Sequence, residues 1–350
     1  MAAQKLRCEA CDCRFEVDLY DAHKRRVRCT QCGEVVLNRT ASTRKSGGSG
    51  TKWVLIILGL IGLLGLGCCG GFGLLFWYSV KPTDFPEQTQ DYADARKVHK
   101  TQLLRQGPSP QIWNVESTPQ GVSEVTYKSR PDLQLKAWIN EPPRGGPKRP
   151  AVLFLHGGFA FDRLDWDHCQ QFRDAGFVTM TPMLRGENGQ LGNYTLLYDE
   201  VDDAVAAAEH LATIPGVDAD RIYVAGHSAG GTLAMLAAMT SKRFKGCASF
   251  SGSPDQVAFV RGQPELAPFD TSNFKELEMR SPLAYPKSFK CPARIYWGNA
   301  EFPFKFSSQK LAKEARVAGL DVQAIEVMGD HLTSVDPAMR LAVTFFQQTK

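Results

Sequence analysis

The chain has 350 residues, of which 41 are Lys or Arg and 37 are Asp or Glu, so its formal net charge at pH 7 is only +4. A charge this small does not require an anionic partner such as a nucleic acid. The sequence contains no internal repeat and no glycine-rich nucleotide-binding fingerprint, so neither a repeat architecture nor a dinucleotide-dependent enzyme is indicated.

Residues 1–40 are predicted to form a zinc ribbon. They contain two Cys-x2-Cys pairs, made of Cys8, Cys11, Cys29 and Cys32. Two such pairs are typical of a closed, structural zinc site, and so small a module would take much of its folding free energy from the metal. Disulfides or unliganded thiols are the alternatives. A further cysteine, Cys13, could compete with Cys11 for the metal.

Basic side chains lie between the two cysteine pairs, at 24–26 and at Arg28. Four cations on a hairpin are most often a solvated face, or an attraction to anionic lipid when a membrane lies nearby, which is the interpretation favoured here. Binding of nucleic acid or protein by a basic ribbon is the alternative. The cytoplasmic partner of the ribbon is therefore left unidentified.

A flexible linker, residues 41–52, leads to a predicted transmembrane helix over residues 53–78. These twenty-six residues carry no charge and have aromatic residues at their ends, a pattern typical of a helix that spans a lipid bilayer. Gly67 and Gly71 have small-xxx-small spacing, which favours close helix approach and suggests a homodimer through this helix.

The distribution of charge predicts the orientation of this single-pass membrane protein. Eleven Lys or Arg precede Trp53, whereas residues 79–98 carry three. The excess places the N-terminus in the cytoplasm and the C-terminal domain outside it. A thiolate zinc site in a reducing compartment agrees with this topology.

The remainder divides into a juxtamembrane segment, residues 79–120, and a domain over residues 121–350. A helix is expected over 92–106 and a β-hairpin over 122–128 and 133–140. Apolar strands then alternate with helical stretches, which predicts an α/β fold with a doubly wound, mostly parallel sheet. The strands are expected at 151–155, 177–183, 221–225, 246–250, 293–297 and 322–328, and the helices at 165–175, 199–213, 230–240, 306–318 and 337–348.

A small cap is expected at about 253–290, between two of these strands. It contains Phe259, Phe269 and Phe274. These aromatic side chains either line an acyl pocket or form the core of the cap, and the sequence does not separate the two interpretations.

A candidate nucleophile lies at the apex of the turn Gly226-His227-Ser228-Ala229-Gly230, between an apolar strand and an Ala/Leu/Met-rich helix. The two glycines suit a turn so tight that side chains there would collide with the neighbouring strand and helix. The pattern predicts a nucleophile elbow with Ser228 exposed at its tip.

A serine hydroxyl needs a base, and the base needs an acid to orient it. Only one histidine, His331, follows Ser228, and it lies in a loop before the last helix. Glu301, after the predicted strand 293–297, is the favoured acid, and Asp255 is the alternative. Asp330 is expected to shape the His331 loop or to cap a helix.

Two backbone N–H groups are expected to form an oxyanion hole. Ala229 follows the nucleophile at the start of a helix and supplies one. The second is expected from Gly158 or Phe159, in a glycine motif that follows the apolar strand 151–155.

These motifs give the chain a specific resemblance. From about residue 151 to residue 347 it resembles the catalytic domain of the prolyl oligopeptidase (S9) group and related α/β-hydrolase esterases. The stretches that carry the resemblance are Leu155-His156-Gly157-Gly158, Leu184-Arg185-Gly186, the run from Asp218 to Ser228, Arg280-Ser281-Pro282-Leu283 and Gly329-Asp330-His331.

The resemblance implies an α/β-hydrolase fold in which Ser228 and His331 are catalytic, while Glu301 departs from the usual Asp. Oligopeptidases of that group carry a β-propeller ahead of this domain, for which residues 79–150 leave no room. The expected function is a membrane-anchored serine hydrolase that cleaves small carboxylic esters or peptide amides without an organic cofactor. An S9-like peptidase acting on short peptides and a non-catalytic, tethered binding module are the alternatives.

Overall fold

The computed structural model describes residues 4–8, 11–17, 26–28, 31–32, 35–37, 81–114, 117–142 and 145–349. The chain divides into two compact units, residues 1–72 and residues 73–350. The predicted linker at 41–52, the predicted span at 53–78 and Cys29 lie outside the described residues. Within the described part of the chain, no helix combines the length and apolarity needed to cross a bilayer.

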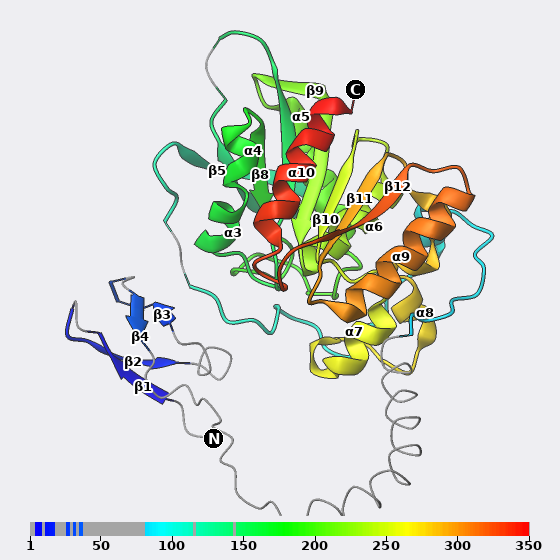
Figure 1. The fold of residues 1–350 in the computed structure, drawn as a ribbon, viewed down its shortest axis with the longest axis horizontal. Coiled ribbons are helices and arrows are strands. Elements are labelled where there is room, and N and C mark those ends of the chain that lie inside the picture. The colour runs from blue at the N-terminus through cyan, green and yellow to red at the C-terminus, as the bar shows by residue number, and fades with distance from the viewer. Residues whose placement is uncertain are drawn as a thin grey trace, which may run out of the picture. The chain divides into compact units, whose positions relative to one another are not determined.

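The N-terminal unit contains two small antiparallel sheets (Figure 1). In one, β1 (Gln4–Arg7) pairs with β2 (Arg14–Val17), and in the other, β3 (Arg26–Arg28) pairs with β4 (Val35–Leu37). Hairpins as short as these described ones bury little apolar surface by themselves.

The second unit is built on an eight-stranded sheet with the order β12-β11-β10-β9-β7-β8-β6-β5. Its neighbouring strands from β12 to β8 pair in parallel, whereas β6 is antiparallel to both β5 and β8. The predicted mostly parallel sheet and its leading hairpin are therefore confirmed. The strands are β5 (Val122–Arg130), β6 (Leu133–Asn140), β7 (Arg149–Leu155), β8 (Val178–Pro182), β9 (Val217–His227), β10 (Cys247–Phe250), β11 (Ala293–Gly298) and β12 (Val322–Val327).

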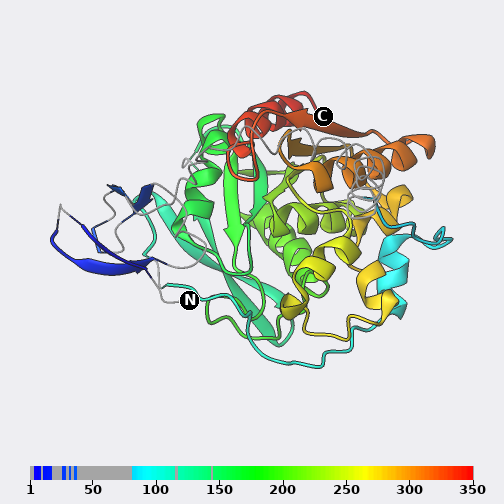
Figure 2. The same ribbon diagram turned by 60° about the horizontal axis from the view of Figure 1, so that its bottom comes forward.

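Helices cover both faces of this sheet, so the central strands are buried on both sides (Figures 1 and 2). In β9, Ile222 and Val224 point into one apolar cluster while Tyr223 and Ala225 point into the other, as the twofold period of a strand requires. The first cluster includes residues of α2 (Tyr92–Val98), α5 (Glu200–Thr213), α6 (Ala229–Thr240) and α9 (Phe302–Val317). The second includes residues of α3 (Arg163–His168), α4 (Gln170–Asp174) and α10 (Val335–Gln348).

The helix expected over 92–106 is wrong in its second half, because α2 ends at Val98. The following residues hydrogen-bond to the cap instead: Leu103 forms a β-bridge with Phe269, and the Leu104 N–H donates to the Pro268 carbonyl oxygen at 2.8 Å. These long-range backbone hydrogen bonds replace the local ones that a continued helix would make. The helix expected over 165–175 is also interrupted, with α3 and α4 meeting at Cys169.

A cap of short helices follows β10 and leads into β11, as expected. It contains α7 (Gln256–Gly262), α8 (Phe274–Glu278) and three 3-10 turns, η1 (Pro264–Leu266), η2 (Pro282–Ala284) and η3 (Pro286–Ser288). Buried Arg280 anchors it to the sheet domain through hydrogen bonds to the carbonyl oxygens of Thr195 and Leu196.

Candidate active site

Ser228 lies at the junction of β9 and α6, in a backbone conformation that few residues adopt. Its φ is 55° and its ψ is −119°. A side chain is excluded on both flanks, because a Cβ on Gly226 would lie 2.3 Å from the Gly230 carbonyl oxygen and one on Gly230 would lie 2.1 Å from the Leu155 carbonyl oxygen. The strand-turn-helix geometry therefore depends on these two glycines, as the sequence predicted.

The structure brings Ser228, His331 and Glu301 together in one hydrogen-bonded chain. His331 Nε2 lies 2.9 Å from Ser228 Oγ, and His331 Nδ1 lies 2.6 Å from Glu301 Oε1. Because an ionised carboxylate only accepts hydrogen bonds, Nδ1 carries the ring proton and Nε2 remains an acceptor for the serine hydroxyl. This arrangement prepares His331 to take a proton from Ser228.

The carboxylate of Glu301 is buried and held on its second oxygen. Ser251 Oγ donates to Oε2 at 2.6 Å and the Gly298 N–H donates to it at 2.7 Å. Burial alone would raise the pKa of Glu301, but the hydrogen bonds from His331, Ser251 and Gly298 lower it below its usual value of 4.5. Glu301 is therefore ionised at neutral pH and fixed in orientation.

The other two carboxylates considered from the sequence have different contacts. Asp255 caps α7, accepting from the N–H groups of Val257 and Ala258, and also accepts from the Thr83 N–H at 2.7 Å. Asp330 accepts from the N–H and hydroxyl of Thr333 and so shapes the loop that carries the histidine. Of the three carboxylates, only Glu301 makes a hydrogen bond to His331 among the described residues.

His227, which precedes Ser228, contacts the backbone of the loop that carries His331. Its Nε2 lies 2.9 Å from the His331 carbonyl oxygen. Burial, together with the nearby His331 and His168, lowers the pKa of His227 to about 4, so at neutral pH the ring is uncharged. Neutral His227 can donate from Nε2 to that carbonyl and hold the loop without adding a positive charge beside Ser228.

The expected oxyanion groups lie around Ser228. Ala229 is the first residue of α6, so its N–H has no acceptor within the helix. Gly158 and Phe159 line the same cleft as Ser228 and Ala229. The Phe159 N–H donates to Gln111 Oε1 at 2.7 Å, a contact that the sequence did not indicate.

A buried ion pair anchors the loop that carries these groups. His156 Nε2 lies 2.9 Å from Glu187 Oε2, and His156 Nδ1 lies 3.0 Å from the Gly157 carbonyl oxygen. Burial lowers the pKa of His156, but the Glu187 carboxylate outweighs it and the pKa is raised to about 9. A protonated ring donates from both nitrogens, so this charge fixes the start of the 157–159 loop.

The cleft beside Ser228 has a volume of about 370 Å³. Its described lining is Pro110, Gln111, Gly158, Phe159, Ser228, Ala229, Phe259, Gln263 and Leu266, and none of these side chains is charged. Of the three cap phenylalanines, Phe259 lines the cleft, whereas Phe269 is buried under Arg280 and Phe274 is partly exposed against Phe85. Phe259 therefore lines the cleft and Phe269 belongs to the core, whereas Phe274 fits neither interpretation.

Comparison with known proteins relates part of this chain to one family. Residues 164–288 match the model of the prolyl oligopeptidase family, peptidase S9. Over 108 residues, 31% of this chain and 42% of the relative, the chain is 33% identical to the uncharacterized peptidase YtmA of Bacillus subtilis strain 168. Over 179 residues, 47% of this chain and 48% of the relative, it is 26% identical to the uncharacterized protein PA2218 of Pseudomonas aeruginosa. The chain spans less than half the length of these two relatives.

Solved structures share the fold. A puromycin-hydrolyzing peptidase of Mycobacterium tuberculosis superposes with a TM-score of 0.57 and 21% identity, covering 65% of this chain and 40% of that one. The acylaminoacyl peptidase of Pyrococcus horikoshii gives 0.55 and 22%, covering 65% and 41%. EstE1, a carboxylesterase from a metagenomic library, gives 0.52 and 21%, covering 66% and 88%.

The domain has the α/β-hydrolase fold. The segment that matches peptidase S9 contains Ser228 and ends before Glu301 and His331. Sequence reasoning did not identify Ser251 or Gln111 as parts of the hydrolase site. Ser251 could have been suspected, because it follows β10 and the carboxyl ends of parallel strands meet at one edge of the sheet. Gln111 carries no comparable signal.

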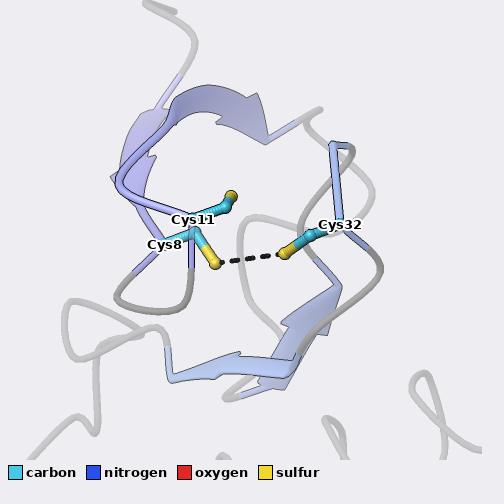
Figure 3. A group of neighbouring side chains, drawn as sticks. All are labelled: Cys8, Cys11 and Cys32. Atoms are coloured by element: carbon cyan, nitrogen blue, oxygen red, sulfur yellow. Dashed lines mark hydrogen bonds between the residues drawn. The ribbon is translucent and has the colours of Figure 1, made fainter.

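Outside the hydrolase domain, three of the four predicted zinc ligands lie close together in the N-terminal unit (Figure 3). The sulfur atoms of Cys8, Cys11 and Cys32 are all within 4.8 Å of one another, and the Cys8 and Cys32 sulfurs are 3.6 Å apart. A tetrahedral thiolate site with Zn–S bonds of about 2.3 Å places sulfurs about 3.8 Å apart, so these residues fit the metal. Cys13 Sγ lies 3.2 Å from Cys11 Sγ, close enough to be an alternative ligand.

Proposed function

We propose that the chain is a membrane-anchored serine hydrolase that cleaves carboxylic esters or peptide amides through an acyl-enzyme. The observation that carries this proposal is the hydrogen-bonded chain from Ser228 Oγ through His331 to Glu301, with distances of 2.9 and 2.6 Å, at the edge of an uncharged cleft. A serine is activated when a base lies within hydrogen-bond reach and a third group orients that base.

In the proposed reaction, Ser228 Oγ attacks the substrate carbonyl carbon while His331 Nε2 takes the hydroxyl proton. The negative charge that develops on the carbonyl oxygen is stabilised by the N–H of Ala229 and by that of Gly158 or Phe159. His331 then returns the proton to the departing alcohol or amine, and the carbonyl re-forms as an ester of Ser228. Water, deprotonated by His331, releases the acid and regenerates the serine.

The lining of the cleft favours a substrate with a neutral acyl group. Its described walls offer apolar surface from Phe259 and Leu266 and two side-chain amides, but no charge to pair with a substrate ammonium or carboxylate. The described residues ahead of the sheet, 81–114, form α2 and an extended segment, and no β-propeller lies among them. An open entrance of this kind favours small esters, with short neutral peptides as the second candidate because the relatives include peptidases.

The proposal for the remainder of the chain is a zinc ribbon in the cytoplasm, tethered by the span at 53–78, with the hydrolase on the other side of the bilayer. The supporting observations are the geometry of Cys8, Cys11 and Cys32 and the uncharged run in the sequence. Bound zinc would supply folding free energy to the N-terminal unit, with Cys8, Cys11, Cys29 and Cys32 as ligands. The partner of the ribbon is a cytoplasmic molecule of unassigned chemistry, and Gly67 and Gly71 favour pairing of two spans.

The test uses the detergent-solubilised full chain and a fluorophosphonate probe, which reacts only with an activated serine. We expect labelling of the wild type and none of Ser228→Ala, followed by turnover of short-acyl esters. If the folded wild type and all its variants stay unlabelled, the hydrolase proposal fails and a non-catalytic binding module takes its place. Turnover of neutral peptides but not of esters would select the peptidase alternative.

A further inference from the structure

A segment from outside the sheet reaches the active site. Residues 103–114, here named the strap, run from the cap toward the cleft. The strap is fixed along its first half: the Leu104 N–H donates to the Pro268 carbonyl oxygen at 2.8 Å, and the Tyr194 N–H donates to the Gly107 carbonyl oxygen at 2.9 Å. Its path is therefore determined by hydrogen bonds to both the cap and the sheet domain.

The fixed part of the strap ends at the 157–159 loop, here named the oxyanion loop, which carries the candidate N–H donors of Gly158 and Phe159. Ser109 Oγ donates to the Phe159 carbonyl oxygen at 2.5 Å, and Gln111 Oε1 accepts from the Phe159 N–H at 2.7 Å. The Gln111 oxygen lies so close that a Cβ on Gly158 would be only 2.6 Å from it. One of the two N–H groups that are candidates for the second oxyanion donor is thus already bound to a side chain of the same protein.

The group that accepts from the Phe159 N–H resembles a substrate in its chemistry. The side chain of Gln111 is a carboxamide, and its oxygen is the same kind of acceptor as the carbonyl oxygen of an amide or ester. The Gln111 side chain also lines the cleft that contains Ser228. A substrate carbonyl that is to use the Phe159 N–H must therefore replace the Gln111 oxygen.

We propose that Gln111 is a gating residue that occupies the Phe159 N–H as an internal competitor of the substrate and so sets the affinity of the hydrolase for it. The proposal rests on the proposed function, because it assigns Phe159 to the oxyanion hole. It adds a specificity element contributed by the strap, outside the segment that matches peptidase S9.

Release of the gate requires movement of only one side chain. Gln111 is exposed, and among the described residues its side-chain amide makes no hydrogen bond other than the one to Phe159. The next residue, Ile112, is 93% exposed, so the chain beyond Gln111 does not hold the amide in place. Exposed side chains change rotamer within nanoseconds, much faster than typical turnover.

The competition has a kinetic signature. An internal ligand lowers the fraction of enzyme that can bind substrate and so raises KM by the same factor, without changing the step that follows binding. One neutral hydrogen bond corresponds to a factor of about 2 to 10. Removing the amide is therefore expected to lower KM about 2- to 10-fold and to leave kcat unchanged.

The experiment measures kcat and KM of the full chain in detergent with p-nitrophenyl acetate, and the inhibition constant of a trifluoromethyl ketone, which forms an oxyanion on Ser228. Gln111→Leu keeps the size of the side chain and removes the acceptor. We expect a lower KM, an unchanged kcat and tighter inhibition by about the same factor. Gln111→Glu, which offers a charged acceptor, is expected to raise KM, because charge-assisted hydrogen bonds are stronger.

Two control variants separate the gate from other effects. Gln102→Leu, at an exposed glutamine of the segment leading into the strap that does not line the cleft, is expected to leave both constants unchanged. Gln263→Leu adds apolar surface to the same cleft at a residue without a hydrogen bond to Phe159, and we expect it to lower KM less than Gln111→Leu does.

The outcomes distinguish the gate from the hydrolase proposal. A fall in kcat for Gln111→Leu would show that Gln111 positions the loop and would overturn the gate. An unchanged KM for Gln111→Leu would also overturn it. So would equal changes in KM for Gln111→Leu and Gln263→Leu. Fluorophosphonate labelling of Gln111→Leu but not of the wild type would support the gate. Labelling of neither would overturn the hydrolase proposal and the gate with it.

Discussion

Replacing Glu301 by Gln is the substitution that tests the assembled site most directly. Gln keeps the size of the side chain and can keep the hydrogen bonds from Ser251 and the Gly298 N–H by placing its oxygen where Oε2 now lies. Its NH2 group then faces His331 Nδ1. Because an NH2 group only donates, Nδ1 must become an acceptor and the ring proton must move to Nε2. In that tautomer His331 presents a donor to Ser228 and is unable to take its proton.

These contacts allow the expected fall in kcat of Glu301→Gln to be bounded. Because Glu301 is ionised, its hydrogen bond to His331 is charge-assisted, and it strengthens further when His331 becomes protonated. Hydrogen bonds to charged groups contribute about 1.5–3 kcal/mol, or a factor of about 10 to 150 in rate. The wrong tautomer adds to this, and comparable triads lose up to about 10⁴ in kcat. We therefore expect kcat of Glu301→Gln to fall by about 10² to 10⁴, with less loss in Glu301→Asp, which keeps the charge at a longer distance.

The assay is ester hydrolysis by the full chain, with thermal unfolding measured in parallel to establish that the variants fold. Asp255→Asn is the matched control, because Asp255 caps α7 and has no hydrogen bond to His331 among the described residues. Asn caps helices about as well as Asp, so this variant is expected to fold and to leave kcat unchanged. A kcat within about threefold of the wild type for Glu301→Gln, or a collapse of kcat in Asp255→Asn instead, would refute the assignment of the acid.

Further predictions concern the oxyanion loop, the elbow and the N-terminal unit. The pKa of His156 is raised from 6.5 to about 9. The protonated ring therefore stabilises the folded state fully below pH 6.5, and this stabilisation is lost as the pH rises through about 9. Thermal unfolding measured against pH should show this loss in the wild type and not in His156→Gln. Gly230→Ala should destabilise the domain by about 3 kcal/mol or more, because its Cβ would lie 2.1 Å from a backbone oxygen, whereas Gly262→Ala, with open space around it, should be tolerated; denaturant unfolding compares the two, and equal stability would contradict the steric account of the elbow. Metal analysis should find one zinc per chain in the wild type and less in Cys8→Ser, and full occupancy in that variant would remove Cys8 from the ligand set.

Much of the fold and of the candidate site could be predicted from the sequence, because the patterns that carry them are local. Strands buried on both faces appear as short apolar runs, and the predicted sheet agrees with β7 to β12. The elbow needs glycine two residues before and two residues after Ser228, and both glycines can be read in the pentapeptide 226–230. His331 could be placed because it is the only histidine after Ser228, and the structure brings it to the serine.

Other features depended on contacts between residues far apart in the chain. The run 92–106 favours a helix by itself, yet hydrogen bonds to Pro268 draw its second half into the strap. The choice between Glu301 and Asp255 was open in the sequence, because each follows a parallel strand and only the course of the loops decides which carboxylate reaches His331.

The sequence by itself determined the order of elements and the identity of Ser228 and His331, since backbone sterics and strand periodicity act between near neighbours. Only the tertiary structure decided that Ser251 holds Glu301 and that Gln111 meets the Phe159 N–H. Each of these contacts joins residues about fifty positions apart in the chain. Their formation depends on how the connecting loops pack, which no local pattern of residues encodes.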